Sequence, residues 1–372
     1  MAMLIDAPAG LEGVVAANTS VGDVRGEEGF FHYRGYSAPE LARTRSLEDV
    51  WHLMHHGTLP TPAERQAFAV QTAPLRALPA HLREALPAFA SVGTPMAALR
   101  TALSMSGQDA PSWLDVDDDA RASQALRLVA MMPTAIAALW RTREGLAIVD
   151  PDQGSSIARD YLRMVTGTKP SDLAVRAVEQ YLILTIDHGF NASTFTSRVV
   201  ASTGADMTAA ATAGISALSG PLHGGAPSRV IDMLRQIGDA GAARPWLERA
   251  LASGQRIMGF GHRVYRTEDP RSVVLKETAL ALGGPTVELA VEVERVAREI
   301  LEQKYPQRNL RTNVEFYAGV VLHEIGVPAA LFPPTFAASR MIGWMAHVRE
   351  QMTGNRIIRP ASRYTGPLHS VA

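Results

Sequence analysis

The sequence predicts an almost entirely helical protein with one small β-hairpin near its N-terminus. Beyond residue 40, most of the chain consists of stretches of roughly 10–20 residues rich in Ala, Leu and Met, which favour helix. Several stretches follow a Ser, Thr or Asp that is suited to cap a helix. Segment 14–36 differs, because it carries Val, Thr, Phe and Tyr interrupted by glycines. These three observations indicate the all-α class.

The first elements can be placed from local signals. Gly26–Gly29 (Gly-Glu-Glu-Gly) is typical of a hairpin turn between two short strands. Ser37 is suited to cap a helix with a proline in its first turn. Ser46 precedes the next helix, with Asp49 in the capping-box position. Thr61 then begins a third helix.

The remaining elements are predicted from the periodicity of apolar residues and from the Gly and Pro residues that interrupt it. A helix over 206–219 is apolar nearly all round, which predicts burial in a large core. Surface loops are expected at 111–119 and 145–154. The expected helices beyond residue 80 are 83–91, 94–106, 117–141, 153–166, 170–187, 191–203, 206–219, 227–238, 244–253, 271–282, 285–305, 313–325 and 333–352.

Composition excludes several classes of protein. The 372 residues include no cysteine, which excludes disulfides, a thiolate nucleophile and cysteine-ligated metal. With 36 basic and 37 acidic residues, the net charge of −1 argues against a nucleic-acid partner. No signal peptide and no uncharged run of 18 apolar residues is present, so we expect no membrane partner and a cytoplasmic location.

Arginine dominates the basic residues. Only Lys169, Lys276 and Lys304 are lysine, so the other 33 of the 36 basic residues are arginine. Coding bias is the simplest interpretation of this excess, but arginine also binds carboxylates and phosphates through two parallel hydrogen bonds.

The first chemistry-bearing cluster is Ser219–Pro227, in which three glycines surround His223. Such a segment lets the backbone approach a ligand closely. The alternative is a glycine-rich turn with an incidental histidine.

The second cluster, Met258–Arg266, combines Gly-Phe-Gly with His262 and two arginines, and Arg271 follows it. It lacks the third glycine and the strand–helix context of a dinucleotide-binding fingerprint. A pocket for an anion fits better, and a solvated basic loop is the alternative.

Two further segments carry candidate groups. Glu315, in Asn313–Tyr317, lies in the expected first turn of a helix among apolar neighbours, a setting that can tune a general base. A surface glutamate is the alternative. His188 is suited either to substrate binding or to a structural role near a helix end. No zinc-binding, nucleophile-elbow or Walker A motif is present, so no metal is expected.

Taken together, these segments resemble citrate synthases. Gly-Pro-Leu-His-Gly-Gly (220–225), Gly-Phe-Gly-His-Arg-Val-Tyr (259–265) with Asp-Pro-Arg (269–271), and Asn313–Tyr317 stand in the family's order and spacing. The likeness extends from Gly10–Gly13 and Tyr33–Tyr36 to Arg356–Pro360 and Gly366-Pro367.

The resemblance implies an almost all-helical homodimer with two domains per chain. Residues 1–224 and 327–372 would form the large domain, and residues 225–326 the small one. The cleft between them would close on substrate. The implied reaction condenses acetyl-CoA with oxaloacetate, through an enol(ate) and citryl-CoA, to citrate and CoA. No cofactor is needed, since acetyl-CoA is a co-substrate.

The resemblance also implies residue roles. His223 would hydrogen-bond the thioester oxygen, His262 would polarise the ketone of oxaloacetate, and Glu315 would be the base. Oxaloacetate or citrate would contact His188, Arg271, Arg340 and, from the partner chain, Arg359. CoA would contact Met258, Gly259, Arg266 and Asn313.

The sequence departs from the family pattern at the base, where Glu315 stands in place of the usual aspartate. The added methylene moves the carboxylate by about 1 Å or more if the backbone is unchanged, and such a shift can cost on the order of 100-fold in rate. Two alternatives therefore stay open. One is a 2-methylcitrate synthase that uses propionyl-CoA, since one methyl group changes pocket affinity by only about 1–3 kcal/mol. The other is a non-catalytic paralogue that binds CoA or a carboxylate.

Overall fold

A small antiparallel sheet begins the ordered body of the chain. In the computed structural model, which describes residues 5–223, 226–262, 265 and 267–369, β1 (Gly22–Arg25) pairs with β2 (Phe30–Tyr33). The connection is the expected turn at residues 26–29, so the predicted hairpin is confirmed. A two-residue strand that the sequence did not suggest, β3 (Tyr36–Ser37), adds to β2 and gives the order β1-β2-β3.

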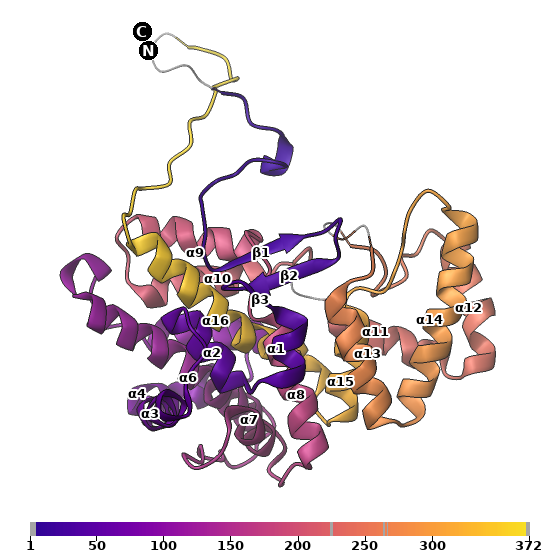
Figure 1. The fold of residues 1–372 in the computed structure, drawn as a ribbon, viewed down its shortest axis with the longest axis horizontal. Coiled ribbons are helices and arrows are strands. Elements are labelled where there is room, and N and C mark those ends of the chain that lie inside the picture. Colours follow the sequence, from indigo (N-terminus) through magenta and orange to yellow (C-terminus); the bar gives the residue numbers. More distant parts are fainter. Residues whose placement is uncertain (1–4, 224–225, 263–264, 266, 370–372) are drawn as a thin grey trace.

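Helices make up most of the described residues, which confirms the all-α class. The longest, α6, occupies the core, and α16 runs through the middle of the molecule (Figure 1). The helices are α1 (Ala38–Thr44), α2 (Leu47–His56), α3 (Pro62–Thr72), α4 (Ala80–Phe89), α5 (Pro95–Met105), α6 (Asp118–Arg143), α7 (Ile157–Thr166), α8 (Asp172–Thr185), α9 (Ala192–Ser202), α10 (Met207–Leu218), α11 (Ala226–Ile237), α12 (Ala243–Ala252), α13 (Pro270–Leu282), α14 (Pro285–Lys304), α15 (Val314–Glu324) and α16 (Phe332–Met352).

Side-chain caps explain where many helices begin. The hydroxyls of Ser37, Ser46 and Thr61 accept backbone N–H groups at the starts of α1, α2 and α3. Helix α7 begins at Ile157, later than expected, because Ser156 caps it. Helix α4 begins at Ala80, earlier than expected, after a proline that makes no side-chain cap.

One expected loop is partly wrong. The segment 111–119 holds a short 3₁₀ helix, Trp113–Asp115, and the start of α6. The indole of Trp113 is buried and donates to the carbonyl of Ala201, 2.8 Å away, which anchors the turn.

Helix α6 is the only helix of the described residues long and apolar enough to cross a membrane. Of its most apolar 18-residue window, 72% is buried inside the protein. It packs against α7, α5 and α16, which makes it a core helix.

Helix α10 was expected to be buried all round, and the single chain shows otherwise. One face, including Ala210, Gly214 and Ile215, is buried. The opposite face, with Thr212, Ala213 and Ser216, is at least partly exposed. The apolar character of α10 is therefore only half explained by packing within one chain.

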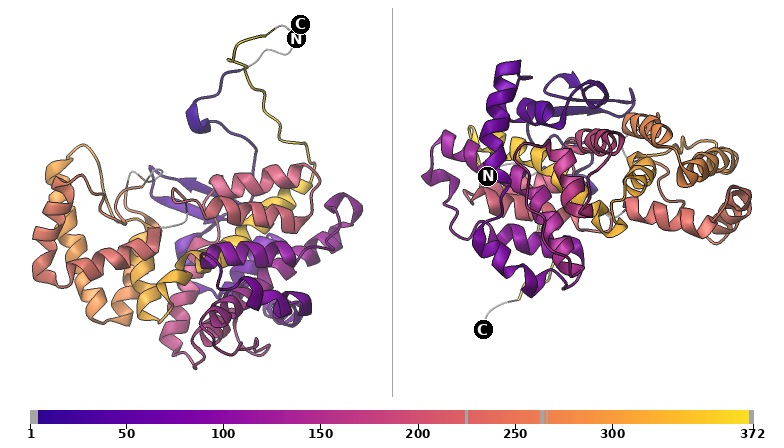
Figure 2. Two further views of the ribbon diagram at one scale, coloured as in Figure 1. Left: turned by 180° about the vertical axis from the view of Figure 1, so that it is seen from behind. Right: turned by 90° about the horizontal axis from the view of Figure 1, so that it is seen from below.

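Helices α11 to α14 lie to one side of the other helices (Figures 1 and 2). Helix α15 packs on α13 and α11 and also contacts α8, so it bridges the two groups. The domain boundaries at 224/225 and 326/327 stay a prediction. Two extended arms, residues 5–19 and 354–369, leave the helical body at different points and converge (Figure 1), where an ion pair of Asp6 with Arg363 at 3.0 Å joins them.

Candidate functional site

Three histidines and two arginines from four separate segments make up the candidate site, beside α8, which contacts both α13 and α16. His188 lies in the turn between α8 and α9, and its Nε2 is 2.9 Å from the hydroxyl of Tyr265. Its ring lies 5.6 Å from that of His262. Burial, and then the charges of Arg271, His262 and Arg340, hold the pKa of His188 well below its usual range. His188 is therefore a neutral imidazole.

The orientation of His262 is set by the loop that carries it. Its Nδ1 accepts the backbone N–H of Tyr265 at 3.0 Å. Its Nε2 lies 3.1 Å from Nη2 of Arg271, which can only donate. Burial and the charge of Arg271 lower the pKa of His262 to about 4. Donors therefore face both ring nitrogens of His262, one from the backbone of Tyr265 and one from Arg271.

Arg271 is held in position by Asp269. Nε of Arg271 lies 3.0 Å from one carboxylate oxygen and Nη2 lies 2.9 Å from the other. Both residues are buried. Burial alone would lower the pKa of Arg271, but the carboxylate of Asp269 outweighs burial and raises it. Arg271 is thus a fixed cation in the site.

His223 lies in the turn between α10 and α11, against the start of α9. Its Nε2 lies 2.8 Å from the hydroxyl of Ser193 and accepts the backbone N–H of Ser193 at 3.3 Å. Because a backbone N–H can only donate, the ring hydrogen lies on Nδ1. Burial and then Arg340 lower the pKa of His223 to about 4. His223 is a neutral donor, and His188 and His262 are also neutral.

Glu315 is the second residue of α15, where Asn313 caps the helix by accepting the N–H of Glu315 at 3.0 Å. Burial raises the pKa of Glu315 to about 7, and Asp269 adds to this, while Arg271, Arg229 and Arg256 oppose it. Near neutral pH, this carboxylate is poised to accept a proton.

The loop around Gly259 is tied to the start of α15. Gly259 and Gly261 have φ near +80°, and the carbonyl of Gly259 accepts the N–H of Asn313 at 2.9 Å. A Cβ on Gly259 would lie 2.8 Å from the Cβ of Phe316, so only glycine fits. Nδ2 of Asn313 donates to the carbonyl of Gly261 at 2.9 Å. The backbone N–H and the side-chain Nδ2 of Asn313 therefore both position the loop that carries His262.

The buried carboxylate of Glu294 holds the segment that leads into α15. Glu294 of α14 accepts the hydroxyl of Thr312 at 3.1 Å and that of Tyr317 at 2.5 Å. Lys276 of α13 pairs with it at 2.6 Å. This cluster joins α13, α14 and α15 and fixes the segment that precedes Glu315.

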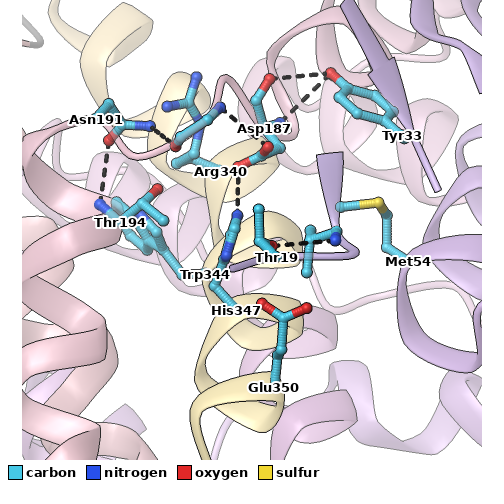
Figure 3. A network of polar contacts seen from close by, with 12 residues as sticks. Thr19, Tyr33, Met54, Asp187, Asn191, Thr194, Arg340, Trp344, His347 and Glu350 are labelled. Atoms are coloured by element: carbon cyan, nitrogen blue, oxygen red, sulfur yellow. Dashed lines mark hydrogen bonds and ion pairs between the residues drawn. The ribbon is translucent and has the colours of Figure 1, made fainter. Parts of the chain in front are cut away.

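Arg340 enters the site from the middle of α16. Its Nε donates to the carbonyl of Thr185 at 2.9 Å. Burial lowers the pKa of Arg340 to about 10, although Asp187 opposes the shift. Figure 3 shows Arg340 beside Asp187, the residue that precedes His188.

Asp187 is held by a chain of polar contacts. It accepts Nε2 of His347 at 3.2 Å and the N–H of Gly189 at 3.2 Å (Figure 3). Nδ1 of His347 lies 3.2 Å from Arg198, which pairs with Glu350 at 2.6 Å. Burial would raise the pKa of Asp187, but His347 and Arg340 outweigh it and lower the pKa. The turn that carries His188 is thereby fixed to α9 and α16.

The roles of three residues proposed from the sequence stay predictions. Arg359 lies exposed on the C-terminal arm. Arg266 lies outside the described residues. Met258 is half-buried beside Gly259, and its contact with CoA stays a prediction.

Sequence reasoning missed several supporting residues. Ser193, Tyr265, Asp269, Asp187 and His347 each hold a predicted site residue, or the turn that carries one. In the sequence, Asp269 stands out only as part of Asp-Pro-Arg (269–271), and Ser193 only as part of Asn-Ala-Ser (191–193). Among the described residues, no group of three or more His, Asp or Glu side chains is arranged to hold a metal ion.

Comparisons with known proteins cover nearly the whole chain. A family model described as citrate synthase, C-terminal domain, matches residues 10–361. A citrate synthase of Synechocystis is 40% identical over 365 residues, spanning 96% of this chain and 90% of that protein. A 2-methylcitrate synthase of Mycobacterium tuberculosis is 38% identical over 363 residues, spanning 97% and 91%.

Solved structures agree with these relatives. The crystal structure of citrate synthase from Pyrobaculum aerophilum is similar with a TM-score of 0.90 and 34% identity, covering 100% of this chain and 97% of that one. A ternary complex of citrate synthase from Thermoplasma acidophilum with carboxymethyl coenzyme A and oxaloacetate gives a TM-score of 0.89 at 28% identity, covering 98% and 97%.

Proposed function

The chain belongs to the citrate synthase family of acyltransferases, and from this premise we propose that it condenses acetyl-CoA with oxaloacetate in the site described above. One observation carries the proposal: a carboxylate with a pKa of about 7 lies under the electrostatic influence of Arg271, as does the neutral imidazole of His262, while the neutral imidazole of His223 lies under that of Arg340. The reaction needs a base for a weak carbon acid and donors for two developing oxyanions.

In the first step, the carboxylate of Glu315 removes a proton from the methyl group of acetyl-CoA. The electron pair of the C–H bond forms the enol(ate), and negative charge develops on the thioester oxygen. His223 donates its Nδ1 hydrogen to that oxygen. A neutral imidazole suits this role, because a hydrogen bond from a fixed donor stabilises the oxyanion in a site screened from water.

In the second step, the enol(ate) carbon attacks the ketone carbon of oxaloacetate, and a carbon–carbon bond forms. The ketone oxygen gains the electron pair, takes a ring proton from neutral His262 and becomes a hydroxyl. The proton that Glu315 accepted in the first step balances the one that His262 gives up. Arg271 and Arg340 bind the carboxylates of oxaloacetate, and His188 contacts it between them. The product is citryl-CoA. Water then breaks the thioester bond and releases citrate and CoA.

We propose that the loop carrying His262 also contributes residues that bind CoA. Met258 and Gly259 would lie along the CoA chain, and Arg266 would pair with its phosphates. Asn313 would contribute near the same place, in addition to the positioning bonds that it makes. Closure of the small domain, residues 225–326, on the large one would exclude water from the enol(ate).

We further propose a cytoplasmic homodimer, in which Arg359 reaches the partner's site. The exposed face of α10 and the two extended arms support this assembly, because both lack cover within one chain. Isologous pairing of α10 faces would bury small side chains against one another.

A CoA-release assay on the purified protein tests the proposal. Acetyl-CoA and propionyl-CoA are each offered with oxaloacetate, and the products are identified by mass. Preferred turnover of acetyl-CoA to citrate supports the proposal. Preferred turnover of propionyl-CoA identifies a 2-methylcitrate synthase, and no turnover of either identifies a non-catalytic paralogue.

A further inference from the structure

A polar cavity lies at the C-terminal end of α16, lined by residues other than those of the site described above. Its volume is about 360 Å³, and it lies between the end of α2, the start of α6 and the end of α16. Three arginines line it, Arg34, Arg121 and Arg349, together with His55 and Glu350. Met54 and Glu350, which Figure 3 labels, are also among the residues that line it.

Two of these arginines have no carboxylate partner within hydrogen-bond distance among the described residues. Arg34 donates to the hydroxyl of Ser20 at 2.8 Å and to the carbonyl of Met54 at 3.2 Å, and its buried Nε has no partner. Arg349 donates to the carbonyl of His55 at 2.8 Å. Two guanidinium groups without a carboxylate partner favour a ligand that brings negative charge between them.

The acids around the cavity are already engaged. Asp118 pairs with Arg121 at 2.6 Å. Glu350 pairs with Arg198 at 2.6 Å, and its other oxygen accepts Ser20 at 2.7 Å. The lining residues and their ion-pair partners thus supply four guanidinium groups and two carboxylates. Positive charge is in excess, and His55 adds none near neutral pH, because burial and Arg349 lower its pKa to about 3.

The pKa of Arg349 also reflects this excess of positive charge. Burial and then the charge of Arg34 lower the pKa of Arg349, and Asp118 opposes the shift. Burial lowers the pKa of Arg34, and Glu350 opposes it. An anion placed between the two guanidinium groups would remove the repulsion and supply the missing acceptors.

We propose that this cavity binds a small oxyanion with two or more negative charges, of the phosphate or polycarboxylate class. The two charges match the excess of guanidinium groups. The volume suits a small ligand, since ligand pockets begin at about 300 Å³. Arg34 and Arg349 bind the oxygens directly, and Arg121 contributes its charge from the rim.

Titration calorimetry on the full-length protein tests the site, with inorganic phosphate and tricarballylate as separate probes. Saturating oxaloacetate is present, so that the arginines of the other site are occupied. We expect saturable binding of at least one probe, and the tighter probe identifies the ligand class. Arg34→Gln and Arg349→Gln should each weaken binding about tenfold or more, because a charge-assisted hydrogen bond is lost.

Arg235→Gln, an exposed arginine of α11 far from the cavity, is the matched control and should leave the dissociation constant unchanged. Circular dichroism verifies that each variant is folded. If Arg349→Gln does not fold, Arg349→Lys keeps the charge but loses the planar fork, and it should weaken binding several-fold. No saturable binding of either probe, or equal affinity in the wild type and the Arg34 and Arg349 variants, would overturn the proposal.

Discussion

The carboxylate of Asp269 joins Arg271 to the start of the helix that carries Glu315. One oxygen accepts Nε of Arg271 and the backbone N–H of the same residue, each at 3.0 Å. The other accepts Nη2 of Arg271 at 2.9 Å and the N–H of Val314 at 3.0 Å. One buried side chain therefore sets the distance between the substrate-binding cation and the base.

Asp269→Asn should damage both stability and catalysis. The variant leaves a buried guanidinium without its counter-ion, which typically costs about 3–5 kcal/mol. We expect that loss in the free energy of unfolding in urea, with a higher KM for oxaloacetate and a lower kcat. Asp172→Asn is the matched control, because Asp172 pairs with Arg159 on the surface and should lose less than about 1 kcal/mol. Equal effects of the two substitutions would refute the role of Asp269.

Gly259→Ala should be far more harmful than Gly254→Ala. Both glycines have positive φ, +79° and +75°, so the backbone strain is matched. Only at Gly259 would the added Cβ meet Phe316, while nothing lies within 4 Å at Gly254. We expect an additional loss of about 1–3 kcal/mol for Gly259→Ala and a raised KM for acetyl-CoA. Indistinguishable melting temperatures would show that the close contact with Phe316 is unimportant.

The pH dependence of the enzyme should follow Glu315. Because burial raises its pKa to about 7, kcat/KM for acetyl-CoA should rise with pH through about 7 as the base ionises. His223 and His262, with pKa values of about 4, stay neutral from pH 5 to 8 and should cause no further change of kcat/KM in that range. An activity that is flat between pH 6 and 8 would contradict the assignment.

The raised pKa of Glu315 also affects the free energy of unfolding. Its pH dependence is opposite to that of most carboxylates, whose pKa is lowered by folding. The folded-state pKa lies above the unfolded value of 4.5, so the native state is penalised as pH rises through about 7. Glu315→Gln should therefore be more stable than the wild type at pH 8, by about 2–3 kcal/mol. The difference should vanish below pH 4.5. A variant that is less stable at pH 8 would contradict the burial of this carboxylate.

Arg359 offers a test of the proposed dimer. His223→Ala and Arg359→Gln should each be inactive as homodimers. When the two chains are coexpressed, a mixed dimer holds one complete site, so a random mixture should regain about a quarter of wild-type activity. A mixture that stays inactive, or full activity of Arg359→Gln alone, would rule out a cross-subunit role.

Local signals predicted most of the fold. The hairpin turn at residues 26–29 and the caps Ser37, Ser46 and Thr61 need only a few consecutive residues, and each is confirmed. Helix α4 was misplaced because Pro79 begins it without a side-chain cap. Strand β3 was missed because its two residues acquire their structure only from β2.

The candidate site was predictable only in part. Clusters around His223, His262 and Glu315 were visible because glycine, histidine and carboxylate stand close together in sequence. The partners that orient them were not visible. Ser193 meets His223 across 30 residues, and His347 meets Asp187 across 160. No period or spacing in the sequence encodes such contacts, which depend on how α9, α11 and α16 pack.

Proton removal by Glu315 is the central claim, and exchange of the methyl protons of acetyl-CoA tests it most directly. In D₂O with oxaloacetate or a non-reactive analogue present, proton NMR follows loss of the methyl signal. Glu315→Gln should slow the exchange about 100-fold or more, whereas Glu324→Gln, at the other end of α15, should leave it unchanged. Full exchange activity in Glu315→Gln would contradict the account.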